Sequence, residues 1–158
     1  MDAEIGRVYG NRLRVRACGL CWHEDKLLMV QHSGLGDGKL WSPPGGGIEF
    51  GNTAYATLIQ EFEEETKIKI EPGRFLFACE YISPPLHALE FFFEVFYTAG
   101  EISPGFDPEM TRNTQIIRQV QWLSSEQIKE LPPENLHGIF KHCAHPQDLM
   151  KLTGYWQI

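Results

Sequence analysis

A glycine-rich stretch followed by a helix crowded with carboxylates constrains this chain more than any other feature. The stretch occupies residues 44–51, and the acidic residues follow on the next predicted helix. Glycine lets backbone approach a ligand or metal closely, and helical residues three or four apart share a face. The pattern therefore predicts Glu61, Glu64 and Glu65 on one helix face beside a glycine turn. Glu63 falls on the other side. Cation-assisted phosphate chemistry requires this combination.

Length and composition favour one compact domain. The chain has 158 residues with 42% apolar character, enough to bury one core but hardly two, so we expect a single domain over residues 1–158. No run approaches the ~18 apolar residues of a membrane span, and the first residues lack the basic and apolar regions of a secretion signal. We therefore expect a cytoplasmic protein without a membrane partner.

Charge and cysteine content exclude further classes. The net charge of −7 opposes nonspecific attraction to nucleic-acid backbone or anionic membrane, so a nucleic-acid partner is not expected. An anionic substrate would need a cation to mediate. Cys18 and Cys21 lie in a strand-like run, whereas Cys79 and Cys143 are isolated, so no second close pair completes a zinc site. Buried free thiols are the favoured interpretation, with disulfides as the alternative.

Apolar and aromatic runs predict strands along the chain. They occupy residues 13–22, 27–32, 74–82, 87–97 and 114–122. The first two form a hairpin, and the next two pair across residues 83–85. In the strand 87–97, one face is wholly apolar and should meet a core. The other face includes Glu90 and Phe92 and mixes charge with aromatic rings, so we expect it to border a site.

Helices are predicted at three places. Thr53 suits the cap of the acidic helix, and four residues at helical spacing form its inward stripe. They are Ala56, Ile59, Phe62 and Thr66. Ser124 caps a short second helix, and a third covers residues 136–143. The tail, 155–158, is apolar enough to dock on the body or on a partner, which leaves a homodimer open.

Residues 46–68 resemble the signature box of the Nudix hydrolases, whose pattern is Gx5Ex7RE, an apolar residue, xEExG and a second apolar residue. The matching positions are Gly46, Glu61, Phe62, Glu64, Glu65 and Ile68. The likeness extends to the preceding residues 41–46 and to 121–124. Three positions depart from the box: Asn52 replaces glutamate, Gln60 replaces arginine and Lys67 replaces glycine.

The resemblance implies an α/β fold, a Nudix-like α/β/α sandwich with a mixed central sheet. It also implies hydrolysis of a pyrophosphate bond in a nucleoside diphosphate linked to another moiety. Magnesium is the usual cofactor, with manganese as an alternative, and both prefer hard oxygen donors. By that likeness the catalytic residues are Glu61, Glu64 and Glu65. The same glutamates and the Gly45 carbonyl would be the metal ligands.

The departures bear on activity. Gln60 keeps an amide donor but supplies no charge, so repulsion between Glu61 and Glu65 is less compensated. Lys67 makes a left-handed helix cap costlier, although a cation suits a helix C-terminus. We expect these changes to weaken metal binding rather than abolish it. They leave open a second interpretation, a catalytically weak or inactive Nudix-fold regulator that binds a ligand.

Substrate contacts are suggested by cations on the first strands. Arg12, Arg14 and Arg16 alternate and could face phosphate, with Arg14 or Arg16 favoured, although a solvated strand face explains them equally well. His32 ends the second strand, where phosphate contact competes with a surface position. Candidate general bases outside the box, otherwise solvated loop residues, are Glu101, Asp107 and Glu109. Candidate stacking platforms, for which core packing is favoured, are Phe77, Tyr81 and Phe92.

Overall fold

The protein is represented by a computed structural model that describes residues 3–33, 38–105 and 117–158. Its strands are β1 Arg12–His23, β2 Lys26–His32, β3 Leu40–Ser42, β4 Gly45–Gly47, β5 Lys69–Ser83, β6 Leu86–Ala99, β7 Ile117–Ser124 and β8 Tyr155–Gln157. Its α-helices are α1 Ala3–Tyr9, α2 Ala54–Thr66 and α3 Ser125–Glu130. Short 3-10 helices cover Pro133–Asn135, Gly138–His142 and Pro146–Lys151.

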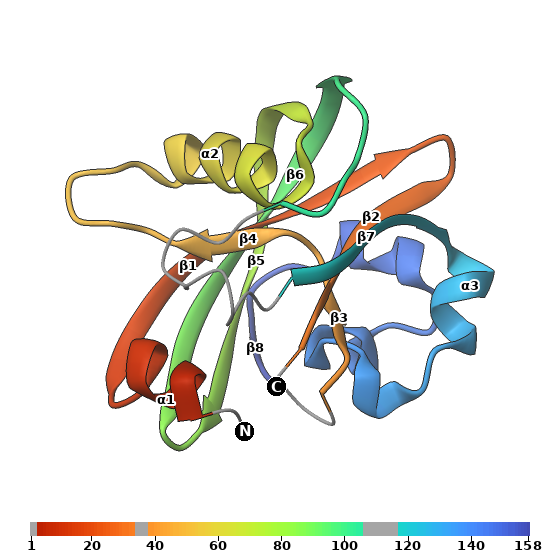
Figure 1. Ribbon diagram of the computed structural model, residues 1–158. Helices are drawn as coiled ribbons and strands as arrows, with labels where there is room; N and C mark the ends of the chain where they lie inside the picture. The colour runs from red at the N-terminus through yellow and green to blue at the C-terminus, as the bar shows by residue number, and fades with distance from the viewer. Residues whose placement is uncertain (1–2, 34–37, 106–116) are drawn as a thin grey trace.

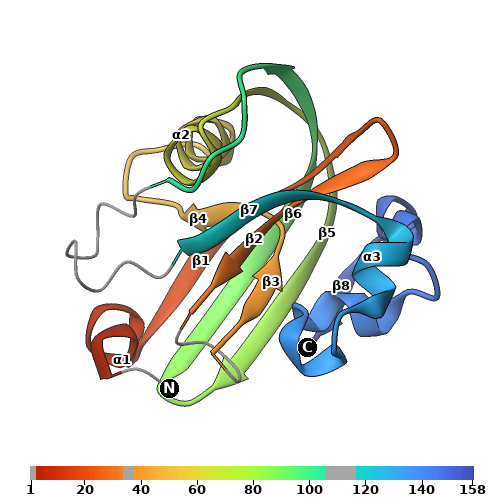
Figure 2. The ribbon, with the colours of Figure 1, turned by 45° about the vertical axis from the view of Figure 1, so that its right-hand side comes forward.

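The strands of the described residues form one mixed sheet. Its order is β3-β2-β1-β6-β5-β8, with β4 paired to β1 and β7 paired to β2. β1 and β6 are parallel, whereas β5 and β6 form a long antiparallel hairpin. Helix α2 covers one face, and α3 with the 3-10 helices covers the other (Figures 1 and 2). The fold is therefore the mixed-sheet α/β sandwich that the resemblance implied.

Each face of the sheet has its own hydrophobic core. On one face, Leu58 and Phe62 of α2 pack into the first cluster. On the other, Ile128 of α3 joins a cluster that contains Phe77 and Phe92. The rings of Phe77 and Phe92 stack with centroids 4.8 Å apart, and both are fully buried. Core packing, not a substrate platform, is thus the role of these two rings.

The predicted glycine turn is wrong, because residues 45–47 form strand β4, antiparallel to β1. None of these glycines has a positive φ, so a turn conformation does not require them. The close approach of β4 to β1 does require glycine, because a Cβ on Gly45 would lie 2.5 Å from the Ala17 carbonyl oxygen. Glycine at this position lets β4 lie against β1 without a side chain between the two backbones.

Helix α2 begins and ends where the sequence indicated. Thr53 is its N-cap, and the Thr53 Oγ1 accepts a hydrogen bond of 3.0 Å from the Ala56 N–H. The predicted inward stripe is half wrong, because Ala56 and Ile59 are exposed. The side chains that the helix buries are Thr57, Leu58, Phe62, Glu65 and Thr66. Apolar spacing could not reveal this face because it includes a carboxylate.

Lys67 ends α2 in the left-handed region, with φ of 67°, and its N–H donates to the Glu63 carbonyl. A residue with a Cβ is strained by roughly 1–2 kcal/mol in this region, whereas glycine is not. Glycine loses more backbone entropy on folding, and this loss offsets part of its advantage. We therefore expect Lys67→Gly to raise the free energy of unfolding by about 0.5–1 kcal/mol in urea titrations. Lys67→Ala removes the charge but keeps the Cβ, and should give no gain. Equal effects of the two substitutions would contradict this account.

The prediction lacks two elements near the termini, α1 and β8. The residue pattern does not predict α1, whose Ile5 and Tyr9 pack with Leu86, because one short helix carries too little periodicity to detect. Nor does it predict β8, which pairs in parallel with β5. The tail thus docks on the body, one of the two predicted outcomes. Residues 138–142 form a 3-10 helix rather than the predicted α-helix.

The remaining expectations concern strand β7, the cysteines and the membrane. β7 begins at Ile117, and the predicted residues 114–116 lie outside the described residues. Ser124 caps α3 in a capping box with Gln127, as expected for the cap. All four cysteines are free thiols, and only Cys143 is not buried. None of the helices in the described ranges has the length and hydropathy that crossing a bilayer would need.

Candidate active site

A cleft of about 420 Å³ lies beside strands β1 and β2. Both strands contribute to its lining, together with β4 and α2. The three box glutamates, Glu61, Glu64 and Glu65, line it, as do Arg14 and Arg16. The cleft therefore brings together the acidic and basic residues that the sequence singled out.

Two carboxylates of α2 meet neighbouring residues of β4. The Gly45 N–H donates to Glu65 Oε2 at 3.1 Å, and Glu65 is buried. A Cβ on Gly46 would lie only 2.2 Å from Glu61 Cδ, so the Glu61 carboxylate rests directly on the Gly46 backbone. Because Gly45 and Gly46 are adjacent, the carboxylates of Glu61 and Glu65 converge on one short segment of strand.

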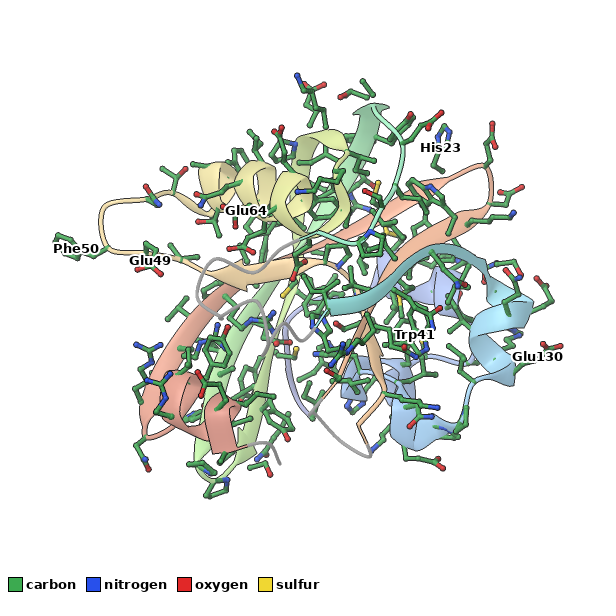
Figure 3. All side chains as sticks on the ribbon, viewed as in Figure 1. His23, Trp41, Glu49, Phe50, Glu64 and Glu130 are labelled. Atoms are coloured by element: carbon green, nitrogen blue, oxygen red, sulfur yellow. The ribbon has the colours of Figure 1, made fainter. Side chains whose placement is uncertain are left out.

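Glu64 lies at the edge of this pair, on the cleft side of α2 (Figure 3). Its Oε1 accepts a hydrogen bond of 2.8 Å from the Gln60 side-chain amide. Glu63, by contrast, is exposed and does not line the cleft, as its helical position predicted. Gln60 thus orients Glu64 through a neutral donor, which contributes less than a charged one.

Arg14 and Arg16 line the cleft from β1, whereas Arg12 does not. The Arg14 guanidinium lies over the Tyr9 ring, 4.2 Å from its centroid. Arg16 is largely buried, and its Nη2 donates to the Gly45 carbonyl at 3.1 Å while its Nη1 pairs with Glu90. A solvated strand face therefore fits only Arg12, which is exposed.

Glu90 is a buried acid that sequence reasoning did not assign to the site. It sits on β6 directly beside Arg16 in the parallel register of β1 and β6. Its Oε2 accepts from His137 Nε2 at 2.7 Å and from the Cys79 thiol at 3.6 Å. Burial alone would raise the pKa of Glu90, but His137 and Arg16 hold it well below its usual range. The available signal was an acid in an aromatic strand, on the mixed face predicted to border a site.

His32 is buried and lines the cleft, so its predicted surface position is wrong. Among the described residues, no group forms a hydrogen bond with its Nδ1. Burial, with the nearby Arg16 and His137, lowers the pKa of His32 to about 3. The imidazole is therefore neutral near pH 7 and gives the cleft a hydrogen-bonding group rather than a cation.

This depressed pKa makes stability depend on pH. An unfolded histidine binds a proton below about pH 6.5, whereas folded His32 does so only near pH 3, so stability present above pH 6.5 is lost as pH falls. Between pH 7 and pH 5 we expect the free energy of unfolding to fall by about 2 kcal/mol from this group. Urea titrations should show the fall in the wild type and in the exposed-residue control His23→Gln, but not in His32→Gln. A fall of the same size in His32→Gln would refute this assignment.

The remaining predicted residues lie at the margin or beyond the described ranges. Glu101 is exposed and is not among the cleft-lining residues, and Asp107 and Glu109 lie outside the described residues. Tyr81 lines the cleft and is partly exposed. Phe50 was not predicted: it stands fully exposed at the tip of the loop between β4 and α2, pointing away from the body (Figure 3).

A match to the NUDIX domain family covers residues 11–142, which includes the cleft walls formed by β1, β4 and α2. The chain belongs to the Nudix family. Members of this family hydrolyse phosphorus-containing anhydrides and generally use divalent metal ions. The acidic residues of the cleft therefore lie within the NUDIX domain.

Individual Nudix relatives are distant. The NAD-capped RNA hydrolase NudC of Pectobacterium carotovorum subsp. carotovorum (strain PC1) is 28% identical over 109 residues, 69% of this chain and 38% of NudC. The chain thus spans about two fifths of that relative. The MutT protein of Methanosarcina mazei Go1 has a TM-score of 0.66 at 17% identity, covering 89% of this chain and 92% of its own. An ADP-ribose pyrophosphatase of Streptococcus suis 89-1591 has a TM-score of 0.61 at 18% identity, covering 90% and 98%. These structural likenesses establish the Nudix fold.

The residues of the Nudix box fit a divalent cation. Carboxylate and carbonyl oxygens are the hard donors that such ions prefer, and the Gly46 backbone cradles the Glu61 carboxylate where a Cβ would displace it. The Gly45 carbonyl accepts from Arg16, and a carbonyl oxygen keeps a second lone pair for another contact. Glu61, Glu65 and Gly45 thus form a compact oxygen-rich set, with Glu64 beside it.

Proposed function

We propose that this chain hydrolyses a pyrophosphate bond in a nucleoside diphosphate linked to another moiety, with Mg²⁺ as its cation and Mn²⁺ as an alternative. One observation carries the proposal: the carboxylates of Glu61 and Glu65 converge on Gly45 and Gly46 in a cleft that also holds Arg14. A pyrophosphate needs both a site for a cation and a positive side chain for its second phosphate. The acidic cluster and Arg14 are suited to these two roles, which supports the proposal.

The proposed roles follow from position. Glu61, Glu64, Glu65 and the Gly45 carbonyl hold the cation, which, when bound, offsets the charge of the diphosphate and acidifies the attacking water. Arg14 contacts phosphate from the cleft wall. His32, neutral and buried, orients the substrate through a hydrogen bond rather than through charge. Candidates for the general base outside the box are Glu101, Asp107 and Glu109.

The names of two relatives support this substrate class. NudC is named for an NAD cap, and the Streptococcus protein for ADP-ribose. In both compounds a nucleoside is joined to a second group through a diphosphate. At these identities the relatives do not fix the second group, because specificity within one fold lies in its loops and strand faces.

A catalytically weak ligand-binding regulator is the second candidate. The observation that favours it is the contact made by Gln60, which holds Glu64 with a neutral amide where the box has arginine. A regulator would keep the cleft and the phosphate contacts but lack turnover.

A substrate panel separates the two candidates. Purified protein is incubated with nucleoside diphosphate sugars, ADP-ribose, dinucleoside polyphosphates and nucleoside triphosphates, each with Mg²⁺, Mn²⁺ or a chelator, and products are resolved by chromatography. The enzyme proposal predicts cation-dependent release of a nucleoside monophosphate from at least one compound of the first three classes. Saturable binding of such a compound without product would establish the regulator. Cleavage that continues undiminished in chelator would contradict the proposed chemistry.

We further propose that the chain is a single domain with a small-molecule partner. The sheet joins strands from β1 to β8, which supports a single domain over residues 1–158. The net charge of −7 supports a small-molecule partner rather than nucleic acid. A cytoplasmic location and a homodimer remain predictions.

A further inference from the structure

A chain of hydrogen bonds links the floor of the cleft, which is formed by Glu90 and His137, to the acidic cluster. His137 Nε2 lies 2.7 Å from Glu90 Oε2, and the other oxygen of Glu90 accepts from Arg16 Nη1. Arg16 Nη2 then donates to the Gly45 carbonyl at 3.1 Å. The Gly45 N–H in turn donates to Glu65 Oε2, also at 3.1 Å. The peptide groups on both sides of Gly45 are therefore held, one by Arg16 and the other by Glu65.

The beginning of this chain is buried and has a fixed hydrogen-bond direction. Glu90 and His137 are 3% and 8% exposed. The Ile139 N–H donates to His137 Nδ1 at 3.3 Å, which leaves the proton of a neutral ring on Nε2, facing Glu90. Such fixed partners orient the residue they contact, because a planar guanidinium bound at two points cannot rotate.

The same fixed direction argues against a metal ion at this floor. Cys79, Glu90 and His137 lie close enough to hold one, with ligand atoms within 4.8 Å of one another. A metal on Nε2 would require that nitrogen to lose its proton while Nδ1 still faces the Ile139 N–H. Glu90 is also already paired with Arg16. The floor therefore acts as a hydrogen-bonded support and not as a second metal centre.

We propose that Arg16 is a positioning residue for the cation site, held in place by Glu90 and His137, and that it supplies the positive charge that Gln60 does not. Arg16 is the cation that bridges Glu90 to the Gly45 carbonyl, and it positions the Glu65 carboxylate through residue Gly45, whose N–H donates to Glu65. It reaches the cluster from β1, whereas Gln60 lies on α2, where its side-chain amide donates to Glu64. This inference rests on the proposed function only in that the cluster binds a divalent cation.

The test measures Mn²⁺ binding by calorimetry, together with the Mg²⁺ concentration for half-maximal turnover. Glu90→Gln keeps the shape of the side chain but weakens its hold on Arg16, and should raise both the Mn²⁺ dissociation constant and the Mg²⁺ requirement by about 10-fold or more. The KM for substrate at saturating cation should stay within about threefold, since the proposed phosphate contact is Arg14 and not Glu90. Arg14→Gln should do the reverse, raising KM and leaving the cation requirement unchanged.

Matched variants separate positioning from folding. Arg12→Gln, an exposed residue on the same strand, should behave as wild type. Should Glu90→Gln fail to fold, the charge-balanced pair Arg16→Gln with Glu90→Gln replaces it, and adding Gln60→Arg to that pair should recover most of the lost cation affinity. Glu90→Gln or the double variant folded with unchanged Mn²⁺ affinity would overturn the inference. So would a failure of Gln60→Arg to recover any affinity in the double variant.

The two proposals fail in different ways. A wild type that binds Mn²⁺ without turning over any substrate refutes the enzyme, yet the binding arm still decides the role of Arg16. A wild type that binds no divalent cation refutes both.

Discussion

Glu65→Gln and Glu61→Gln are each expected to lower cation-dependent turnover by about 10²–10³-fold, equivalent to roughly 3–4 kcal/mol of transition-state stabilisation. Each substitution removes one negative charge from the oxygen set around Gly45 and Gly46 while keeping the size of the side chain. A neutral amide oxygen binds a hard divalent cation more weakly than a carboxylate does. The loss should appear in kcat and in the cation requirement rather than in substrate KM.

Glu63→Gln is the matched control for both substitutions. It makes the same chemical change on the same helix, but its side chain is exposed and lies off the cleft. Its turnover should stay within about twofold of wild type, because an exposed helical charge contributes only tenths of a kcal/mol. Equal losses in Glu63→Gln and Glu65→Gln would show that the helix charge as a whole matters, and not the convergence on β4.

Gly46→Ala is expected to lower turnover by about 10²-fold while leaving the melting temperature within a few degrees of wild type. Its Cβ would lie 2.2 Å from Glu61 Cδ, so the carboxylate must leave the strand. The atoms displaced belong to the end of a flexible side chain, so the fold can accommodate the change. The effect should therefore fall on cation affinity rather than on stability, as measured by calorimetry and thermal unfolding.

Its two neighbours in β4 test this reasoning. A Cβ on Gly45 would meet backbone of β1, including Cys18 Cα at 2.7 Å, so Gly45→Ala should lower stability markedly. A Cβ on Gly47 would lie 3.5 Å from an Arg14 nitrogen, an ordinary contact, so Gly47→Ala should cost far less of either property. Activity in Gly46→Ala equal to that of wild type would contradict the placement of Glu61.

Local signals predicted the elements that carry the cluster. The Thr53 cap and the spacing of Glu61, Glu64 and Glu65 along α2 are properties of consecutive residues, and the structure reproduces both. The resemblance to the Nudix box also predicts the cap at Lys67, because the box has its helix-ending glycine at this position. Such features depend little on the rest of the chain.

Features that depend on contacts between distant segments could not be predicted. Glycine is permissive, so its repetition at residues 45–47 predicts a turn. Only the pairing of β4 with β1 shows that these glycines serve close approach of the two backbones. The buried face of α2 differs from the predicted apolar stripe because Glu65 is buried against Gly45. Gly45 lies outside the helix, so helical spacing does not predict this contact. Likewise, Glu90 and His137 are separated by 47 positions and meet only in the fold.

Calorimetric titration of Mn²⁺ into the wild type and into the Glu61→Gln, Glu65→Gln double variant tests the central claim most directly. That claim is that two carboxylates on consecutive glycines of β4 hold a divalent cation in the cleft. The account predicts saturable uptake by the wild type, raised thermal stability on binding, and loss of both in the double variant. Uptake of equal affinity by the two proteins, or none by the wild type, would contradict it.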